Sequence, residues 1–168
     1  IEAYERVADD LNLSGVETVF VQHEFGIYGG ESGSHLLVLL RRLRMPVIVT
    51  LHTVLETPSA AQKKVMDEII SIASAIIVMS EMGADILDRV HGAGPKKVHV
   101  IPHGAPERPF ASTEPFKAPL GLAGHKVIMT FGLLSPNKGI ETIIKGLPTI
   151  LARHPDAVYL IAGATHPH

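Results

Sequence analysis

The chain has 168 residues, of which 46% are apolar and 19% are charged, and its formal net charge is −2. The apolar content is enough for a buried core, and the absence of Cys excludes a disulfide scaffold. With 15 basic and 17 acidic residues, the chain lacks the basic surface that binds nucleic acid. No apolar run reaches the roughly 20 residues that span a bilayer, so we expect no transmembrane segment.

Six short apolar runs rich in β-branched residues predict strands. They are residues 16–22, 46–51, 75–79, 98–101, 126–131 and 157–162. Stretches with helical periodicity predict helices over 34–44, 59–74, 81–91 and 139–154, the last with a break near Pro148. Ser34 and Ser59 are the expected N-caps of the first two helices. The alternation predicts an α/β protein with parallel sheets and right-handed crossovers.

Residues 105–124 interrupt the alternation with four prolines and little apolar periodicity. Such a segment is typical of a linker or a long surface connection, so we expect a domain boundary there. Only six residues follow the last predicted strand, and the chain starts without Met at a charged amphipathic segment. We therefore expect a piece of a longer protein whose second domain is truncated.

Ligands of open α/β sheets bind at the carboxyl ends of strands, and the first such end carries His23 and Glu24. Gly29 and Gly30 in the same loop permit positive φ and a close backbone approach to a ligand. The alternative, given equal weight, is a flexible loop with a solvated His–Glu pair.

Two more histidines follow predicted strands. His52 could exchange hydrogen bonds with a ligand hydroxyl or phosphate. His103 precedes Gly104, and Pro102 with Gly104 predicts a sharp turn at the edge of a cleft. For both histidines, a hydrogen bond with a purely structural role is the alternative.

The fourth strand end is the most informative, because a strand stops at Gly132 and Lys138-Gly139 opens the next helix. Free N–H groups at a helix N-terminus beside an ammonium predict an anion site, such as one for phosphate. The alternative is an ordinary capped helix start, since the spacing matches neither the P-loop nor the dinucleotide fingerprint. The ten histidines stand without a metal-binding motif and no G-x-S-x-G is present, so we predict no metal site.

The order of five motifs resembles that of the retaining nucleotide-sugar glycosyltransferases of the GT-B fold, family 4 (group 1, mannosyltransferase-like). The motifs are Leu51-His52-Thr53, Val78-Met79-Ser80-Glu81, the segment 97–104, the segment 130–141 and Ile161-Ala162-Gly163. The resemblance implies two Rossmann-like domains facing each other across a cleft, both incomplete in an internal fragment. Residues 1–107 would be the C-terminal part of the acceptor-side domain, 108–124 the linker and 125–168 the first βαβ unit of the donor-binding domain.

The resemblance also implies site residues. His52 matches the histidine near the transferred sugar, with a catalytic role, and Lys138, also assigned as catalytic, contacts the donor diphosphate together with Gly132 and Gly139. The loop with His23, Glu24, Gly29 and Gly30 would contact the acceptor. Ser80, Glu81, His103 and Gly104 would lie at the cleft edge.

The implied reaction moves a sugar from a nucleotide-diphosphate donor to a glycan or lipid-linked acceptor, with retention and without a metal or other cofactor. The fragment would be inactive alone, and its exposed sheet edges favour self-association. We expect a cytoplasmic protein that can associate with the inner face of the membrane.

One departure from the family pattern is Leu133, where the family usually has an Arg that pairs with the lysine on the diphosphate. One cation stabilises a leaving diphosphate less than two do. Two alternatives therefore stay open. One is a degenerate, non-catalytic domain that binds nucleotide or serves in assembly, and the other is a different GT-B enzyme, such as a sugar-nucleotide epimerase or a phosphorylase.

Overall fold

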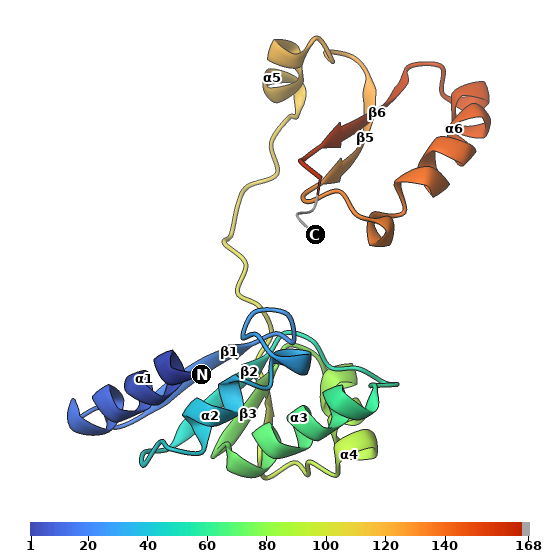
Figure 1. Ribbon diagram of the computed structural model, residues 1–168. Coiled ribbons are helices and arrows are strands. Elements are labelled where there is room, and N and C mark those ends of the chain that lie inside the picture. The colour runs from blue at the N-terminus through green and yellow to red at the C-terminus, as the bar shows by residue number, and fades with distance from the viewer. Residues whose placement is uncertain (166–168) are drawn as a thin grey trace. The chain divides into compact units, whose positions relative to one another are not determined.

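The computed structural model describes residues 1–165, and its chain divides into two compact units (Figure 1). The first unit is Ile1–Pro106 and the second begins at Glu107. The last three residues of the predicted segment 125–168 lie outside the described part. None of the helices in residues 1–165 has the length and apolarity needed to cross a membrane.

The first unit is an α/β layer structure built on a parallel four-stranded sheet with the order β1-β2-β3-β4. Its elements are α1 (Glu2–Leu13), β1 (Val19–His23), the 3₁₀ helix η1 (Glu31–Gly33), α2 (Leu36–Leu40), β2 (Val47–Leu51), α3 (Ala60–Ile72), β3 (Ala75–Val78), α4 (Glu81–His91) and β4 (Val98–Val100). All four strands predicted in this unit are present, so the prediction of an α/β fold with a parallel sheet is confirmed.

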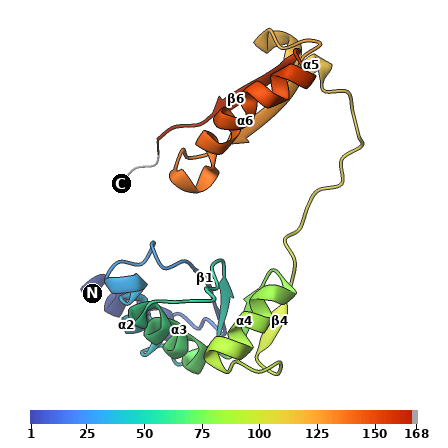
Figure 2. The same cartoon turned by 90° about the vertical axis from the view of Figure 1, so that its right-hand side faces the viewer.

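The core of the first unit lies where the sheet meets helices α2, α3 and α4, which lie side by side (Figure 2). Val49 and Ile76 of the central strands and Ile69 of α3 are completely buried. Full burial of such side chains stabilises a fold by roughly 1.5–3 kcal/mol each. The core therefore holds the strand ends, and the residues that follow them, in fixed positions.

Helices α3 and α4 begin at serines. Ser59 forms a capping box with Gln62, as its Oγ accepts from the Gln62 N–H at 3.2 Å while Gln62 Oε1 accepts from the Ser59 N–H at 2.8 Å. This confirms Ser59 as an N-cap. Ser80 Oγ likewise accepts from the N–H of Gly83 at 3.1 Å, and α4 ends at Gly92 with φ +66°.

The prediction of a helix over 34–44 with Ser34 as its cap was wrong in its bounds and its cap. Ser34 has helical φ and ψ because it ends η1, so it lacks the extended backbone of an N-cap. Beyond α2, the side chain of Asn12 bonds Arg42 O at 2.9 Å and Arg44 N–H at 3.0 Å, taking up backbone groups that a longer helix would use. Asn12 belongs to α1, which the sequence analysis did not predict.

The second unit contains the parallel pair β5-β6 in register from Lys126↔Ala157 to Phe131↔Ala162. Its elements are α5 (Glu114–Lys117), η2 (Ala118–Leu120), β5 (Lys126–Phe131), η3 (Pro136–Lys138), α6 (Ile140–Arg153) and β6 (Ala157–Ala162). Both strands have the predicted bounds. The predicted break near Pro148 is absent, because α6 continues through this residue. Pro148 is exposed, so water can bond the helix carbonyl that lacks an N–H donor there.

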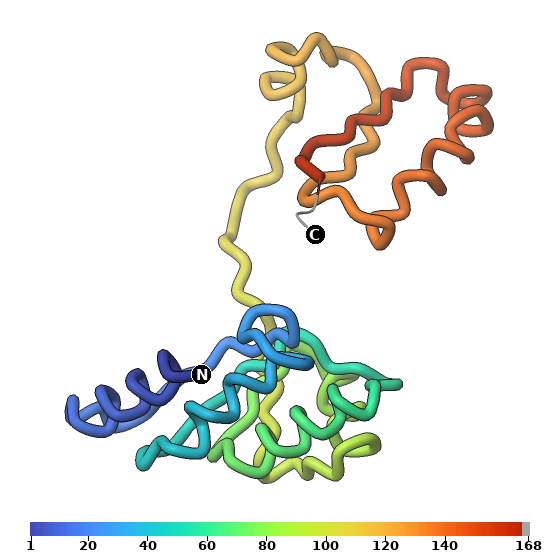
Figure 3. The backbone as a smooth tube through the Cα atoms, viewed as in Figure 1, coloured from blue at the N-terminus to red at the C-terminus, as the bar shows by residue number. Residues whose placement is uncertain are grey.

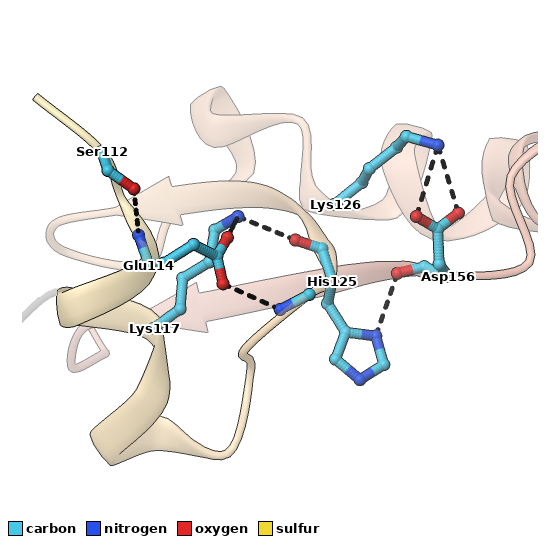
Figure 4. A network of polar contacts seen from close by, with 7 residues as sticks. Ser112, Glu114, Lys117, His125, Lys126 and Asp156 are labelled. Atoms are coloured by element: carbon cyan, nitrogen blue, oxygen red, sulfur yellow. Dashed lines mark hydrogen bonds and ion pairs between the residues drawn. The ribbon is translucent and has the colours of Figure 1, made fainter. Parts of the chain in front are cut away.

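The segment 108–124, predicted as a linker, contains the short helices α5 and η2. Figure 4 shows how α5 is fastened to the start of β5: Glu114 Oε2 accepts from the Gly124 N–H and Lys117 Nζ donates to His125 O, both at 2.9 Å. Lys117 Nζ also donates to Glu114 Oε1 at 2.9 Å, and the bonds that Glu114 accepts, first from the Gly124 N–H and then from Lys117, lower the pKa of its carboxyl group. At least part of the predicted linker is thus folded onto the second unit.

Candidate functional site

The carboxyl ends of β1 and β2 bring polar side chains together in the first unit. The parallel register pairs His23 with Leu51, and the His52 N–H donates to His23 O at 3.1 Å. His52 Nε2 lies 2.7 Å from Gln22 Oε1, and Thr53 Oγ1 donates to Glu24 Oε1 at 2.6 Å. Two side-chain pairs, Gln22–His52 and Glu24–Thr53, therefore link the ends of the two strands.

His103, which follows β4, lies close to His52. Their ring centroids are 6.1 Å apart with an angle of 30° between the planes, and both side chains are exposed. The structure thus brings together two of the histidines singled out in the sequence. The predicted sharp turn is wrong, because residues 101–104 have no turn and Gly104 lacks a positive φ.

His23 lies inside the unit and not on the surface of its loop. Its side chain is completely buried, with the Phe25 ring edge-on at 5.0 Å and the Tyr28 ring stacked at 6.2 Å. Burial lowers the pKa of His23, although the nearby Glu24 carboxylate opposes this. The alternative of a solvated His–Glu pair is therefore wrong for His23. The predicted contact of His23 with the acceptor substrate would require the loop to open.

The glycine-rich loop after β1 is folded against its own residues. Gly29 and Gly30 have φ of +72° and +70°, and a Cβ on Gly30 would lie 2.6 Å from both Ser34 Oγ and His35 Cδ2. Tyr28 fixes the loop through two hydrogen bonds. Its hydroxyl donates to Gln22 O, and its carbonyl accepts from the Tyr4 hydroxyl, each at 2.6 Å. The loop thus requires glycine at these positions for folding alone.

A pocket of about 230 Å³ opens beside His52 at the start of α4. Its lining includes His52, Ser80 and Gly83, and the apolar side chains Met82 and Ile86. The Ser80 hydroxyl is engaged in capping α4, whereas Glu81 is exposed in the first turn. His52 is therefore the side chain that connects this pocket to the pairs at the ends of β1 and β2.

In the second unit, the turn from β5 to α6 joins Gly132, Lys138 and Gly139 (Figure 3, orange). Gly132 has φ +117°, and Lys138 Nζ lies 3.6 Å from the place where a Cβ on Gly132 would stand. Gly139, with φ +62°, is the N-cap of α6. Within residues 1–165, Lys138 forms no ion pair, and its ammonium lies beside the Gly132 turn. Binding of an anion at this turn stays a prediction.

The turn depends on a residue whose contact the sequence analysis did not predict. A Cβ on Gly163, just after β6, would overlap the carbonyl group of Gly132. The Gly132 N–H donates to Ala162 O at 3.0 Å and the Leu134 N–H to Ala164 O at 2.7 Å. Gly163 therefore lets the two backbones approach closely enough to shape the turn under Lys138.

In the described residues, no group of three His, Asp or Glu side chains is placed to hold a metal ion. Gln22 and Thr53, the partners of His52 and Glu24, were missed by the sequence analysis. The signal that could have found them is their position, since each stands next to a residue already selected at a strand end.

The chain is similar in sequence to known glycosyltransferases. Residues 27–107 match the family described as Glycosyltransferase Family 4. The chain is 27% identical to mannosylfructose-phosphate synthase of Agrobacterium fabrum over 103 residues, 57% of this chain and 22% of that protein. It is 26% identical to D-inositol 3-phosphate glycosyltransferase of Corynebacterium kroppenstedtii over 136 residues, 70% of this chain and 30% of that protein.

Two solved structures have the same fold. The structure of Anabaena Alr3699/HepE in complex with UDP and glucose superposes with a TM-score of 0.72 and 18% identity, covering 98% of this chain and 44% of that one. The complex of the same protein with UDP-glucose gives a TM-score of 0.70 and 19% identity, covering 96% and 43%. The chain spans less than half of these proteins and less than a third of the two curated relatives. The chain therefore has an α/β fold of the GT-B type, and its residues 27–107 are similar to the family described as Glycosyltransferase Family 4.

Proposed function

We propose that the chain is part of a glycosyltransferase that moves a sugar from a nucleotide-diphosphate donor to a glycan or lipid-linked acceptor, with retention at the anomeric carbon. The observation that carries the proposal is the Gly132–Lys138–Gly139 turn, in which the Lys138 ammonium lies beside Gly132 and Gly139 is the N-cap of a fourteen-residue helix. The complexes of the structural neighbour with UDP and glucose and with UDP-glucose support a nucleotide sugar as the donor.

In this proposal, the second unit holds the donor diphosphate. Lys138 donates hydrogen bonds to phosphate oxygens, and the positive end of the α6 dipole adds to the attraction. Negative charge accumulates on the diphosphate as the bond to the sugar breaks, so both effects are stronger in the transition state than in the ground state. A metal ion and other cofactors are not part of the proposal, because Lys138 and the α6 N-terminus would supply the positive charge.

The first unit then supplies the sugar and acceptor contacts. His52 lines the 230 Å³ pocket, and the Glu24 carboxylate accepts from the hydroxyl of Thr53, the residue that follows His52. The hydroxyl groups of a glycan or of a lipid-linked substrate can donate hydrogen bonds to an imidazole nitrogen or to a carboxylate. Transfer of mannose, a cytoplasmic location and contact with the inner face of the membrane belong to the same proposal.

The test is saturation-transfer NMR of the chain with UDP, GDP and ADP and with their glucose and mannose conjugates. We expect saturation of the protons of one nucleotide, which identifies the donor base. If no compound received saturation from the protein, a donor site formed by this turn would be contradicted.

Leu133, which is 47% exposed beside the turn, allows a test of the missing cation. Leu133→Arg is expected to tighten binding of the nucleotide diphosphate about two- to fivefold, since an exposed charge pair contributes up to about 1 kcal/mol. Leu133→Gln, which is similar in length but uncharged, is the control and should leave affinity unchanged. Equal affinities of the Arg and Gln variants would refute the argument from charge, and would favour the alternative of a degenerate domain.

A further inference from the structure

The further inference concerns how His52 is protonated. His52 Nε2 lies 2.7 Å from Gln22 Oε1, and the oxygen of an amide can only accept a hydrogen bond. With the amide oriented so that its oxygen faces the ring, the ring donates from Nε2. In a neutral imidazole only one nitrogen carries hydrogen, so Nδ1 is left as an acceptor.

Backbone hydrogen bonds hold Gln22 and His52 in place independently of their side chains. The carbonyl of Gln22 accepts from the Tyr28 hydroxyl at 2.6 Å, and the His52 N–H donates to His23 O at 3.1 Å. These backbone contacts fix the ends of β1 and β2 relative to each other. The amide oxygen therefore meets the ring in a set geometry, and a substitution of the Gln22 side chain leaves both backbone bonds in place.

The other ring nitrogen has no partner of its own. In residues 1–165, Nδ1 of His52 makes no hydrogen bond, while the exposed ring lines the pocket beside Ser80. The nearby Glu24 is also an acceptor, and its Oε1 is already bonded to Thr53. This strand edge thus presents acceptors to a ligand, which suits a hydroxyl group and does not suit a phosphate without protons.

We propose that Gln22 is a positioning residue, which holds His52 with the proton on Nε2 so that Nδ1 accepts a hydrogen bond from a ligand hydroxyl. The identity of that hydroxyl, on the sugar or on the acceptor, rests on the proposed function. The tautomer does not, because it follows from the Gln22–His52 contact alone. Gln22 acts through His52 and need not touch the ligand itself.

The experiment is a long-range ¹H–¹⁵N correlation spectrum of the histidine rings, recorded at about pH 8, above the ordinary pKa of histidine. His52→Gln identifies the His52 signals. We expect the wild-type ring to have its proton on Nε2, and Gln22→Leu to shift the ratio of the two tautomers toward Nδ1–H by about two- to tenfold, the net effect of one hydrogen bond.

Gln22→Glu serves as the rescue variant, because its carboxylate oxygen can accept from Nε2 as the amide does. It should restore the wild-type ratio, which a general loss of structure would not. A wild-type ring protonated mainly on Nδ1 would overturn the proposal even if Gln22→Leu did not fold. So would a folded Gln22→Leu chain with an unchanged ratio. The spectrum is recorded without nucleotide sugar, so failure of nucleotide binding and failure of this inference are separate results.

Discussion

Gly163→Ala is expected to destabilise the second unit by about 1–3 kcal/mol, the usual cost of forcing extra atoms into a filled space. The new Cβ would overlap the carbonyl of Gly132, and both partners are backbone, so no side chain can rotate away. The strands must move apart where Gly132 N–H bonds Ala162 O. Hydrogen exchange of the β5 and β6 amides measures the effect, since it reports local stability in each unit.

Gly146→Ala is the matched control. Gly146 lies within α6, and a Cβ there would meet nothing within 4 Å. Alanine in a helix interior is favoured over glycine by about 0.8–1.0 kcal/mol, so this variant should protect the same unit. Equal protection in the two variants would show that the close contact of Gly132 and Gly163 does not shape the turn.

The second large effect concerns His23 and pH. Desolvation holds the pKa of the buried ring below its ordinary value of 6.5, so the folded first unit keeps this ring neutral. The unfolded chain takes up a proton at His23 as the pH falls below about 6.5, and the folded chain does not. The free energy of unfolding of the first unit is therefore unaffected by this group above that pH, and it falls as the pH decreases from about 6.5 toward the lowered pKa.

His23→Leu should remove this pH dependence from the unfolding of the first unit. At neutral pH it should also stabilise the unit, because neither ring nitrogen has a hydrogen-bond partner in residues 1–165. Such unpaired polar atoms cost about 1–3 kcal/mol, whereas the lost aromatic contacts contribute about 0.5–1.5 kcal/mol. Urea unfolding between about pH 5 and 8 measures both effects, a range that includes the ordinary pKa of histidine.

His99→Leu provides the comparison, because His99 is an exposed histidine on β4 of the same unit. Its removal should leave the pH dependence as in the wild type. A wild-type first unit whose stability stays constant from about pH 7 to pH 5 would contradict the assignment of a buried neutral His23.

The strands could be predicted because their sequences are continuous apolar runs, as in Ala75–Val78 and Ala157–Ala162. Helix α1 coincides with the charged amphipathic segment at the start of the chain, where no helix was predicted, and only Ala8 in it is buried. Helix α5 was also missed. It has no buried residue, and Glu114 and Lys117 hold it by polar contacts that hydrophobic periodicity cannot show.

For the candidate site, the position of a residue after a strand was a useful guide to His52, His103 and the Gly132 turn. It could not tell an exposed strand end from a buried one, which is why His23 was placed in a solvent-facing loop. Position marks Gln22 only as the neighbour of His23, whereas its contact with His52 comes from the register that sets β1 beside β2. Contacts between strands distant in sequence are visible only in the folded chain.

The most direct test of the central claim, that the turn before α6 binds a donor diphosphate, is the affinity of Lys138→Ala. The measurement is an NMR titration with whichever of the UDP, GDP or ADP sugars binds the wild-type chain. We predict about tenfold weaker binding, because a hydrogen bond from a charged group contributes about 1.5–3 kcal/mol and exposure reduces this. Lys145→Ala, at an exposed lysine of α6, should bind as the wild type does. Equal affinities for the two variants would contradict the account.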